Sequence, residues 1–288
     1  MSEYKARFVT EPVVVPLAQM ALMPSGASQM LDWVKSRAPQ CVPDEITDAS
    51  DDVQKMHALF PHDGFQDGRL LTDNELLVEL AGRACYNSFG LKAGRKDNAS
   101  YVEHTQTMSP PHASILYHAK MSFFIAGVSR RVSHELIRNY VGADRTEEGA
   151  PSQQSTRYVE NPGFYVVHPR YLEDETLRAT FDESASSNYL RYRKAIQYEL
   201  ESYESKEGKP AKGIDYKRIL EAASSLLLHS VETSFIWTTN PAALSKLFFE
   251  RDNEAADLEF QRFARKWKRV CMQHWPNLFP ASHMREGL

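Results

Sequence analysis

The sequence predicts an α/β (α+β) fold, in which a helix-rich single domain is built around one modest central mixed sheet. Apolar residues recur at steps of three and four along several long segments, which is the spacing of helices that bury one face. Runs rich in β-forming residues are few and short. The 288 residues, 42% of them hydrophobic, are enough to bury a core without disulfide or metal support.

The chain divides near residue 69 into two parts. Residues 1–68 carry several prolines and an acidic run, and we expect a loop-rich N-terminal extension with one short helix over residues 27–35. Regular structure begins near Leu70, so residues 69–288 are expected to form the main domain.

The first half of the main domain predicts a helix, a strand and a second helix, in that order. Thr72 or Asp73 can cap a helix that runs through Ala81. β-forming residues predict a strand over residues 118–128, and Ser129 can cap a helix that reaches about Arg138. A polar, glycine-containing loop is expected over residues 141–150.

The second half is expected to be mostly helical. Asn240-Pro241 is a typical helix start, with Asn as the cap and Pro at the first helical position. The expected segments, in order, are extended chain over 152–159 and 164–168, and helices over 187–205, over 217–231, from 241 onward, and over 254–274.

The composition excludes several functional classes. Because 34 Lys and Arg are balanced by 38 Asp and Glu, the net charge is −4, and no global basic field is available to hold a nucleic-acid backbone. The N-terminus does not resemble a secretory signal, and no apolar stretch is long enough to span a bilayer. Cys41, Cys85 and Cys271 share no metal or redox spacing. We therefore expect a cytoplasmic protein without membrane contact or bound metal.

Two arginines, Arg138 and Arg157, flank a run of hydroxyl and amide side chains. Arg offers charge-assisted donors in a fork that suits phosphate, and Gln and Ser can read the edge of a base. A nucleotide site is one interpretation, but a solvated loop entering a strand has the same composition, and the residues alone favour that simpler interpretation. The run comprises Ser152, Gln153, Gln154, Ser155 and Thr156.

Arg251 lies between two predicted helices. A cation there could meet an anionic ligand, or it could simply match the dipole of a helix C-terminus, which the residues alone favour. His112 and His118 lack a carboxylate or thiolate at metal-ligand spacing, so we interpret them as hydrogen-bonding residues. The sequence contains no G-x-G-x-x-G, Walker or G-x-S-x-G motif, so any bound flavin would not use a Rossmann turn.

Several spaced segments together resemble one known family, the flavin-dependent thymidylate synthases. Pro110-Pro-His-Ala-Ser-Ile-Leu-Tyr-His118 resembles the family's histidine-containing segment, and Val128-Ser-Arg-Arg-Val-Ser-His-Glu-Leu-Ile-Arg138 its following helix. Ser152-Gln-Gln-Ser-Thr-Arg-Tyr158 resembles the second half of its signature. The family's C-terminal part is matched by residues 237–240, 244–251 and 258–275, so that the resemblance covers roughly residues 74–280 in order.

The resemblance implies an enzyme that converts dUMP to dTMP, with residues 69–288 as its catalytic domain. In this family methylenetetrahydrofolate supplies the methylene group, reduced FAD supplies the hydride, and NADPH recharges the flavin. No protein nucleophile attacks the base, so the protein aligns its partners and stabilises charge on the pyrimidine. The implied partner is a pyrimidine nucleotide, and the implied assembly is a homotetramer with shared active sites.

The resemblance also assigns residues to the site. Arg251 matches the arginine that holds the uracil edge and favours charge on its N3 and O2, which is the catalytic role. Flavin or folate contacts are matched by His112, Ser114 and Asn240. The substrate-binding positions are matched by Glu135, Arg138, Gln153, the adjoining Gln154, Ser155, Thr156 and Arg157.

The chain departs from the family pattern at several of these positions. The signature Arg-His-Arg reads Arg138-Asn139-Tyr140, so Asn139 and Tyr140 stand where the family's His-Arg pair helps hold FAD, and a longer loop follows. Ser224 stands where an arginine normally reaches the nucleotide phosphate, and we expect Arg145 of the inserted loop to replace it. Other replacements are Tyr117 for a glutamate, Ala242 for a flavin contact, and Lys246, which offers a cation to the FAD pyrophosphate.

The leading interpretation is flavin-dependent C5-methylation of a pyrimidine nucleotide, with dUMP as the default substrate. An alternative keeps the chemistry but changes the substrate to UMP or a cytidine nucleotide, or the product to hydroxymethyl. A non-catalytic relative is a third interpretation, which the retention of Arg138, Ser155, Arg157 and Arg251 argues against.

Overall fold

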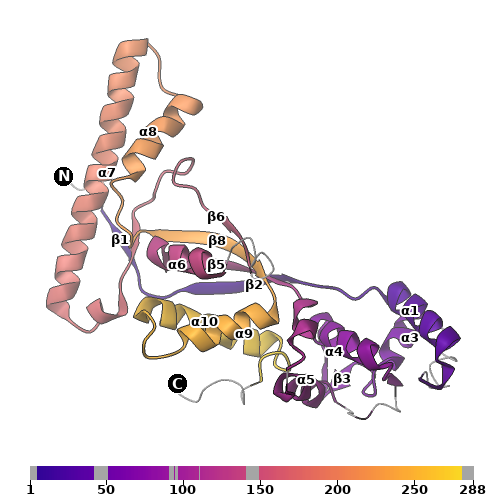
Figure 1. Ribbon diagram of the computed structural model, residues 1–288. Helices are drawn as coiled ribbons and strands as arrows, with labels where there is room; N and C mark the ends of the chain where they lie inside the picture. Colours follow the sequence, from indigo (N-terminus) through magenta and orange to yellow (C-terminus); the bar gives the residue numbers. More distant parts are fainter. Residues whose placement is uncertain are drawn as a thin grey trace.

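The computed structural model describes residues 5–41, 51–90, 94, 97–109, 111–140 and 149–280, with only the backbone of Cys41 and Tyr140 (Figure 1). Arg145 and most of the expected loop over residues 141–150 lie outside these residues. In the described part of the chain, no helix is both long and apolar enough to cross a membrane.

A four-stranded sheet forms the centre of the molecule, and its strands run in the order β2-β5-β8-β6. Every neighbouring pair in it is antiparallel, and Phe123 of β5 lies opposite Trp237 of β8. The helix-rich α/β class is thus confirmed, but the central sheet is antiparallel and not mixed as expected, because the described parallel pairing is confined to a small second sheet, β1 with β7. The strand bounds are β1 Arg7–Val9, β2 Val13–Gln19, β3 Phe65–Gln66, β4 Arg69–Leu70, β5 Met121–Ser129, β6 Ala150–Gln153, β7 Phe164–Val166 and β8 Glu232–Thr239.

Three helices cover one face of this sheet: α6 (Arg130–Tyr140), α9 (Pro241–Arg251) and α10 (Leu258–His274). The core between them is largely aromatic, since Trp267 of α10 packs edge-on against Phe123 of β5. Burying large rings against a sheet removes much apolar surface from water and fixes the helices in place. The N-terminus of α6 and the body of α9 are therefore held by a rigid core.

A second group of helices lies at one end of the sheet (Figure 1). It consists of α1 (Pro24–Arg37), α3 (Asp52–Ala58), α4 (Asp73–Tyr86) and α5 (Asn98–Thr107). Thr72 caps α4 through a capping box with Glu75, as expected from the sequence. Short 3-10 turns occur at Pro39–Cys41, Ala113–Tyr117 (η3) and Pro169–Tyr171.

A helical arm projects from the opposite end of the sheet (Figure 1). Its long helix α7 (Glu175–Glu207) ends at Gly208, which takes the left-handed conformation that suits a C-cap glycine. The returning helix α8 (Ile214–Ser224) packs Ile219 and Leu220 against Tyr192 of α7. The connection from α8 to β8 then passes along the N-terminus of α6, because the Arg131 N–H donates to the His229 carbonyl.

Several other expectations also differ from the structure. The described part of residues 1–68 is not mainly loop, since it supplies β2 to the central sheet; the division of the chain near residue 69 stays a prediction. The helix expected over residues 217–231 ends at Ser224, and β8 was not expected. The strand expected over residues 118–128 begins only at Met121. Residues 155–158 form a turn, stabilised by hydrogen bonds to the Ser155 carbonyl, not an extended segment.

Candidate functional site

A cavity of about 510 Å³ opens where the arm meets the body of the molecule. Its walls come from the first turns of α6, from the end of β6 and from the connection between α8 and β8. Most of its polar groups are hydroxyls, amides and cations, which are suited to an anionic, hydrogen-bonding ligand. The lining residues are Arg130, Arg131, Ser133, His134, Ile137, Gln153, Thr156, Ser224, Ser225, Leu227, Leu228, His229 and Val231.

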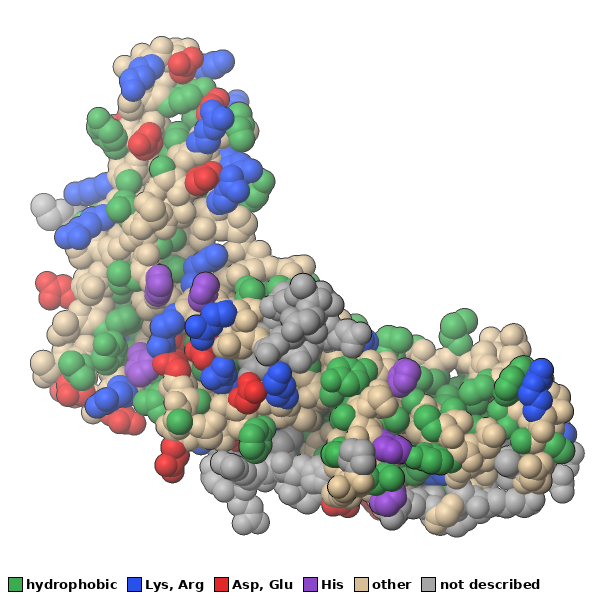
Figure 2. All heavy atoms as spheres, in the orientation of Figure 1, with side chains coloured by type: hydrophobic (Ala, Val, Ile, Leu, Met, Phe, Trp, Pro, Cys, Tyr) green, Lys and Arg blue, Asp and Glu red, His purple; other side chains and the backbone are tan. Residues whose placement is uncertain are grey.

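The polar face of α6 forms one wall of this cavity. Ser129 begins the helix by accepting the Val132 N–H with its hydroxyl, while Val132 and Leu136 face the core. On the opposite side of this helix, Arg130 and His134 line the cavity. On this side of the molecule Lys, Arg and His side chains gather at the foot of the arm (Figure 2). The helix is therefore amphipathic, with a basic outer surface.

Two adjacent arginines at the start of α6 differ in their electrostatic surroundings. Arg131 donates to Asp257 at 2.6 Å and to Glu259 at 2.9 Å. Burial alone would lower the pKa of Arg131, but the hydrogen bonds from these carboxylates outweigh it and raise the pKa. Arg130 forms no ion pair with any described residue, and the one hydrogen bond of its guanidinium to a described residue is a 3.4 Å bond to the Gln154 carbonyl.

Burial without a counter-charge lowers the pKa of the Arg130 guanidinium. A half-buried cation of this kind loses part of its hydration, and no ion pair with a described carboxylate compensates for that loss. Arg130 is therefore the cation in this cavity that is prepared to receive an anion.

Gln153 ties the walls of the cavity together. Its side-chain amide donates to the Ser133 hydroxyl of α6 at 2.9 Å and to the Thr233 hydroxyl of β8 at 3.0 Å. Thr156 lines the same cavity, and the fixed amide of Gln153 leaves its carbonyl oxygen available for a further hydrogen bond. Gln154 contributes through its backbone, since its N–H donates to the Ser234 carbonyl.

Ser155 and Arg157 belong to the turn that follows β6. The Ser155 hydroxyl accepts the Arg157 N–H at 3.3 Å, and the Arg157 guanidinium pairs with Glu221 of α8 at 2.9 Å. Both members of this ion pair are about half exposed, so the pair is weak and Arg157 can exchange partners.

Arg251 and Glu135, both predicted site residues, form an ion pair of 3.1 Å. Arg251 is the last residue of α9, and its guanidinium lies over the Phe260 ring at 5.2 Å. Its Nε is buried and has no hydrogen-bond partner in the described part of the chain. Arg138 lies one turn after Glu135 on α6, is exposed, and makes no hydrogen bond or ion pair with a described residue.

His112 lies in a different region, beside a second cavity of about 320 Å³ near α4 and α5. Its ring is stacked on the Tyr86 ring at an interplanar angle of 6°, and its Nδ1 lies 3.1 Å from the Tyr86 hydroxyl. Ser114 is exposed on η3, which packs against α9. The wall of this cavity is thus aromatic and flat.

The other predicted cofactor residues lie on α6 and α9. Asn240 is fully buried and caps α9 by accepting the Ala243 N–H at 2.9 Å, so its side chain has a structural role whatever else it does. Lys246 and Asn139 are half-buried. The side chain of Tyr140 and the whole of Arg145 lie outside the described residues. That Arg145 takes the role of the arginine that the family has at position 224 therefore stays a prediction.

The structure adds residues that the sequence did not single out. The first cavity is also lined by Arg130, Ser133 and His229. The sequence does not distinguish Arg130 from Arg131, although the structure pairs Arg131 with Asp257 and Glu259, which lie far away along the chain. A basic residue directly after a strand, at the start of an amphipathic helix, was the signal available for Arg130. Among the described residues, no group of three or more His, Cys, Asp or Glu could hold a metal ion.

Comparison with known proteins places this fold in a family. Residues 69–277 match the family model described as "Thymidylate synthase complementing protein". A flavin-dependent thymidylate synthase of Mycobacterium sp. (strain KMS) is 36% identical over 193 residues, which cover 65% of this chain and 72% of the relative. The enzyme of the same name from Corynebacterium aurimucosum is 31% identical over 216 residues, covering 74% of this chain and 82% of the relative.

Two solved structures are similar in fold. The UMP/dUMP methylase PolB from Streptomyces cacaoi, bound with 5-Br UMP, is 12% identical and covers 96% of both chains with a TM-score of 0.57. A flavin-dependent thymidylate synthase from Helicobacter pylori, complexed with FAD and dUMP, is 18% identical and covers 74% of this chain and 96% of its own, with a TM-score of 0.52. The family model, which matches residues 69–277, and the curated relatives show that the chain belongs to the flavin-dependent thymidylate synthases, a family of methyltransferase enzymes.

Proposed function

We propose that this enzyme methylates C5 of a uracil nucleotide, with dUMP as the default substrate, and that the 510 Å³ cavity binds the nucleotide. The observation that carries the proposal is Arg130, a half-buried cation that forms no ion pair within the described chain and lines a cavity rich in hydrogen-bonding groups. A phosphate would return the charge compensation that Arg130 lacks.

The base end of the nucleotide would lie toward the Arg251–Glu135 pair. Glu135 follows Arg130 by five residues on α6, which is an axial rise of about 7.5 Å and a turn of about 140° around the helix. Neither Glu135 nor Arg251 lines the cavity, so the base would have to extend out of it and past the side of α6 to reach this pair. Arg251 would hold the uracil edge and stabilise charge that develops on N3 and O2. Gln153 and Thr156 would then border the sugar and the base, and Arg138 and Ser155 would complete the polar surround.

The cavity beside Tyr86 and His112 fits a planar ring system, because its wall is flat and aromatic and its remaining lining is largely apolar. We therefore propose FAD as the cofactor, held by His112 and Ser114 and by the cation of Lys246. When bound, FAD would supply the hydride, with NADPH and methylenetetrahydrofolate as cosubstrates. Asn139 and Tyr140 would border it in place of a His-Arg pair. We further propose a homotetramer with shared sites.

UMP is the second candidate substrate. It is favoured by the fold similarity to the UMP/dUMP methylase over 96% of this chain, which includes the N-terminal extension. The two substrates differ only at the 2′ position of the sugar, so a single polar contact decides between them.

The test is direct. Purified enzyme is supplied with FAD, NADPH, methylenetetrahydrofolate and either dUMP or UMP, and the product is identified by mass. The proposal expects a product heavier by one methylene unit that depends on Arg251, and rescue of a thymidine-requiring strain if dUMP is the substrate. Failure to convert either nucleotide, in protein that has taken up FAD, would refute it.

A further inference from the structure

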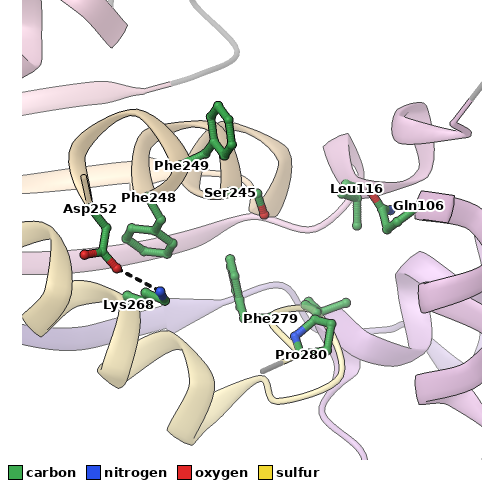
Figure 3. A pocket seen from close by; sticks show the side chains of 10 residues that line it. Gln106, Leu116, Ser245, Phe248, Phe249, Asp252, Lys268, Phe279 and Pro280 are labelled. Atoms are coloured by element: carbon green, nitrogen blue, oxygen red, sulfur yellow. Dashed lines mark hydrogen bonds and ion pairs between the residues drawn. The ribbon is translucent and has the colours of Figure 1, made fainter. Parts of the chain in front are cut away.

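The C-terminus of α9 is anchored to α10 through Asp252, the residue that follows Arg251. The Asp252 N–H closes the helix by donating to the Phe248 carbonyl at 2.9 Å. Its carboxylate accepts from the Arg265 Nε at 2.7 Å through one oxygen. The other oxygen accepts from the Lys268 Nζ at 2.9 Å (Figure 3). Because the two donors bind different oxygens from one face of α10, they fix the orientation of the carboxylate.

This anchor is buried. The side chains of Asp252 and Lys268 are 9% and 5% exposed, whereas Arg265 reaches the surface. Burial alone would raise the pKa of Asp252, but the hydrogen bonds from Arg265 and Lys268 outweigh it and lower the pKa. The carboxylate therefore remains charged and its contacts with α10 persist.

Packing beside this anchor is incomplete. A cavity of about 110 Å³ lies against the anchor, and Phe248, Phe249 and Phe279 are among the residues that line it (Figure 3). Asp252 and Lys268 both line this space, so the end of α9 has room to shift if the ionic contacts are removed. Phe248, one turn earlier, packs edge-on against Trp267 and holds the body of α9, whereas the ionic contacts hold residue 252 beside this space.

The position of the Arg251 side chain depends on where residue 252 is held. Its described contacts are the ion pair with Glu135, the ring face of Phe260, which also belongs to α10, and a buried Nε without a described partner. One ion pair leaves a long guanidinium side chain free to tilt unless its backbone is held. We propose that Asp252, with Arg265 and Lys268, positions Arg251 for its contact with the uracil ring, an inference that rests on the proposed function.

The experiment compares Asp252→Asn, Lys268→Met and the double variant, each with and without Arg251→Lys. Both single changes are expected to lower Tm, because each leaves a buried charge less well compensated. The double change removes both charges and is expected to restore Tm. Because small misplacements at a reacting centre cost up to about 100-fold in rate, kcat of the double variant is expected to stay about 10- to 100-fold below wild type.

Coupling to Arg251 separates positioning from stability. Arg251→Lys is expected to cost several-fold less in kcat in the double variant than in wild type, because Arg251 is already misplaced there. Lys266→Met, an exposed change on the same helix, is the matched control and should change neither Tm nor kcat. Lys268→Arg keeps a donor and should retain most of the activity.

Two results overturn the inference. Wild-type kcat and KM in the double variant, or an equal cost of Arg251→Lys in both backgrounds, would show that the anchor is only structural while the proposed function stands. Wild-type enzyme that takes up FAD but neither binds nor converts dUMP or UMP would refute the proposed function and, with it, the role given to Arg251.

Discussion

Replacing Arg130 with methionine tests whether the cavity at the foot of the arm binds phosphate. The change keeps the length of the apolar stem and removes the charge. Arg130 forms no ion pair with the described residues, so its removal leaves no carboxylate without a partner. The folded enzyme without nucleotide should therefore keep its Tm or gain slightly, because a desolvated charge is lost.

Nucleotide binding should respond in the opposite direction. A hydrogen bond between a charged donor and a phosphate contributes about 1.5–3 kcal/mol. At about 1.4 kcal/mol per factor of ten, Arg130→Met should weaken dUMP binding by roughly 10- to 150-fold. Binding of deoxyuridine, which lacks the phosphate, should be unchanged.

The assay is titration calorimetry with dUMP and with deoxyuridine, together with Tm measured without ligand. Arg131→Met is the matched control, because Arg131 is the next residue of α6 and lines the same cavity, but it forms ion pairs with Asp257 and Glu259. Loss of that partly buried pair should cost about 1–3 kcal/mol of unfolding free energy. A lowered Tm for Arg130→Met with unchanged dUMP affinity would refute the reasoning.

Three further predictions concern other parts of the structure. Burial alone would raise the pKa of Glu79, but its contacts with His62 and Arg83 outweigh burial and lower the pKa. The stabilisation of the fold by Glu79 is therefore fully present above the pH range where a free Glu titrates, and it is lost as the pH falls through the pKa of the folded state. Glu79→Gln should therefore lower urea stability at neutral pH and flatten its fall in acid; an acid limb as steep as in wild type would contradict this. Glu221→Gln should change the free energy of unfolding by less than about 1 kcal/mol, and it should raise dUMP affinity because Arg157 loses its ion-pair partner. Weaker dUMP binding would count against a nucleotide role for Arg157. Tyr86→Leu removes a ring pair of about 0.5–1.5 kcal/mol and should weaken FAD binding roughly two- to tenfold by flavin absorbance, and unchanged flavin content would exclude this wall as the flavin site.

Local signals in the sequence predicted the helix starts. Thr72, Ser129 and Asn240 each cap the expected helix, because a cap depends only on the two or three residues that follow it. The strand β8 was not predicted. Its inward residues pair with strands far away in sequence, and the apolar run before it reads as a continuation of α8.

The candidate site was predicted only in part. Resemblance to the family assigns Arg251 and Glu135 to the site, which stays a prediction, and the structure shows that the two residues form an ion pair. The distinction between Arg130 and Arg131 depends on carboxylates about 126 residues away, at Asp257 and Glu259, so no local pattern could reveal it. The anchor at Asp252 likewise needs the packing of α9 on α10 to be known.

A crystal structure of the enzyme with dUMP tests the central claim most directly. The account predicts the phosphate within hydrogen-bond distance of Arg130, in the cavity between α6, β6 and the α8–β8 connection, and the uracil edge at Arg251. A nucleotide bound elsewhere, or a phosphate that leaves Arg130 without a contact, would contradict it.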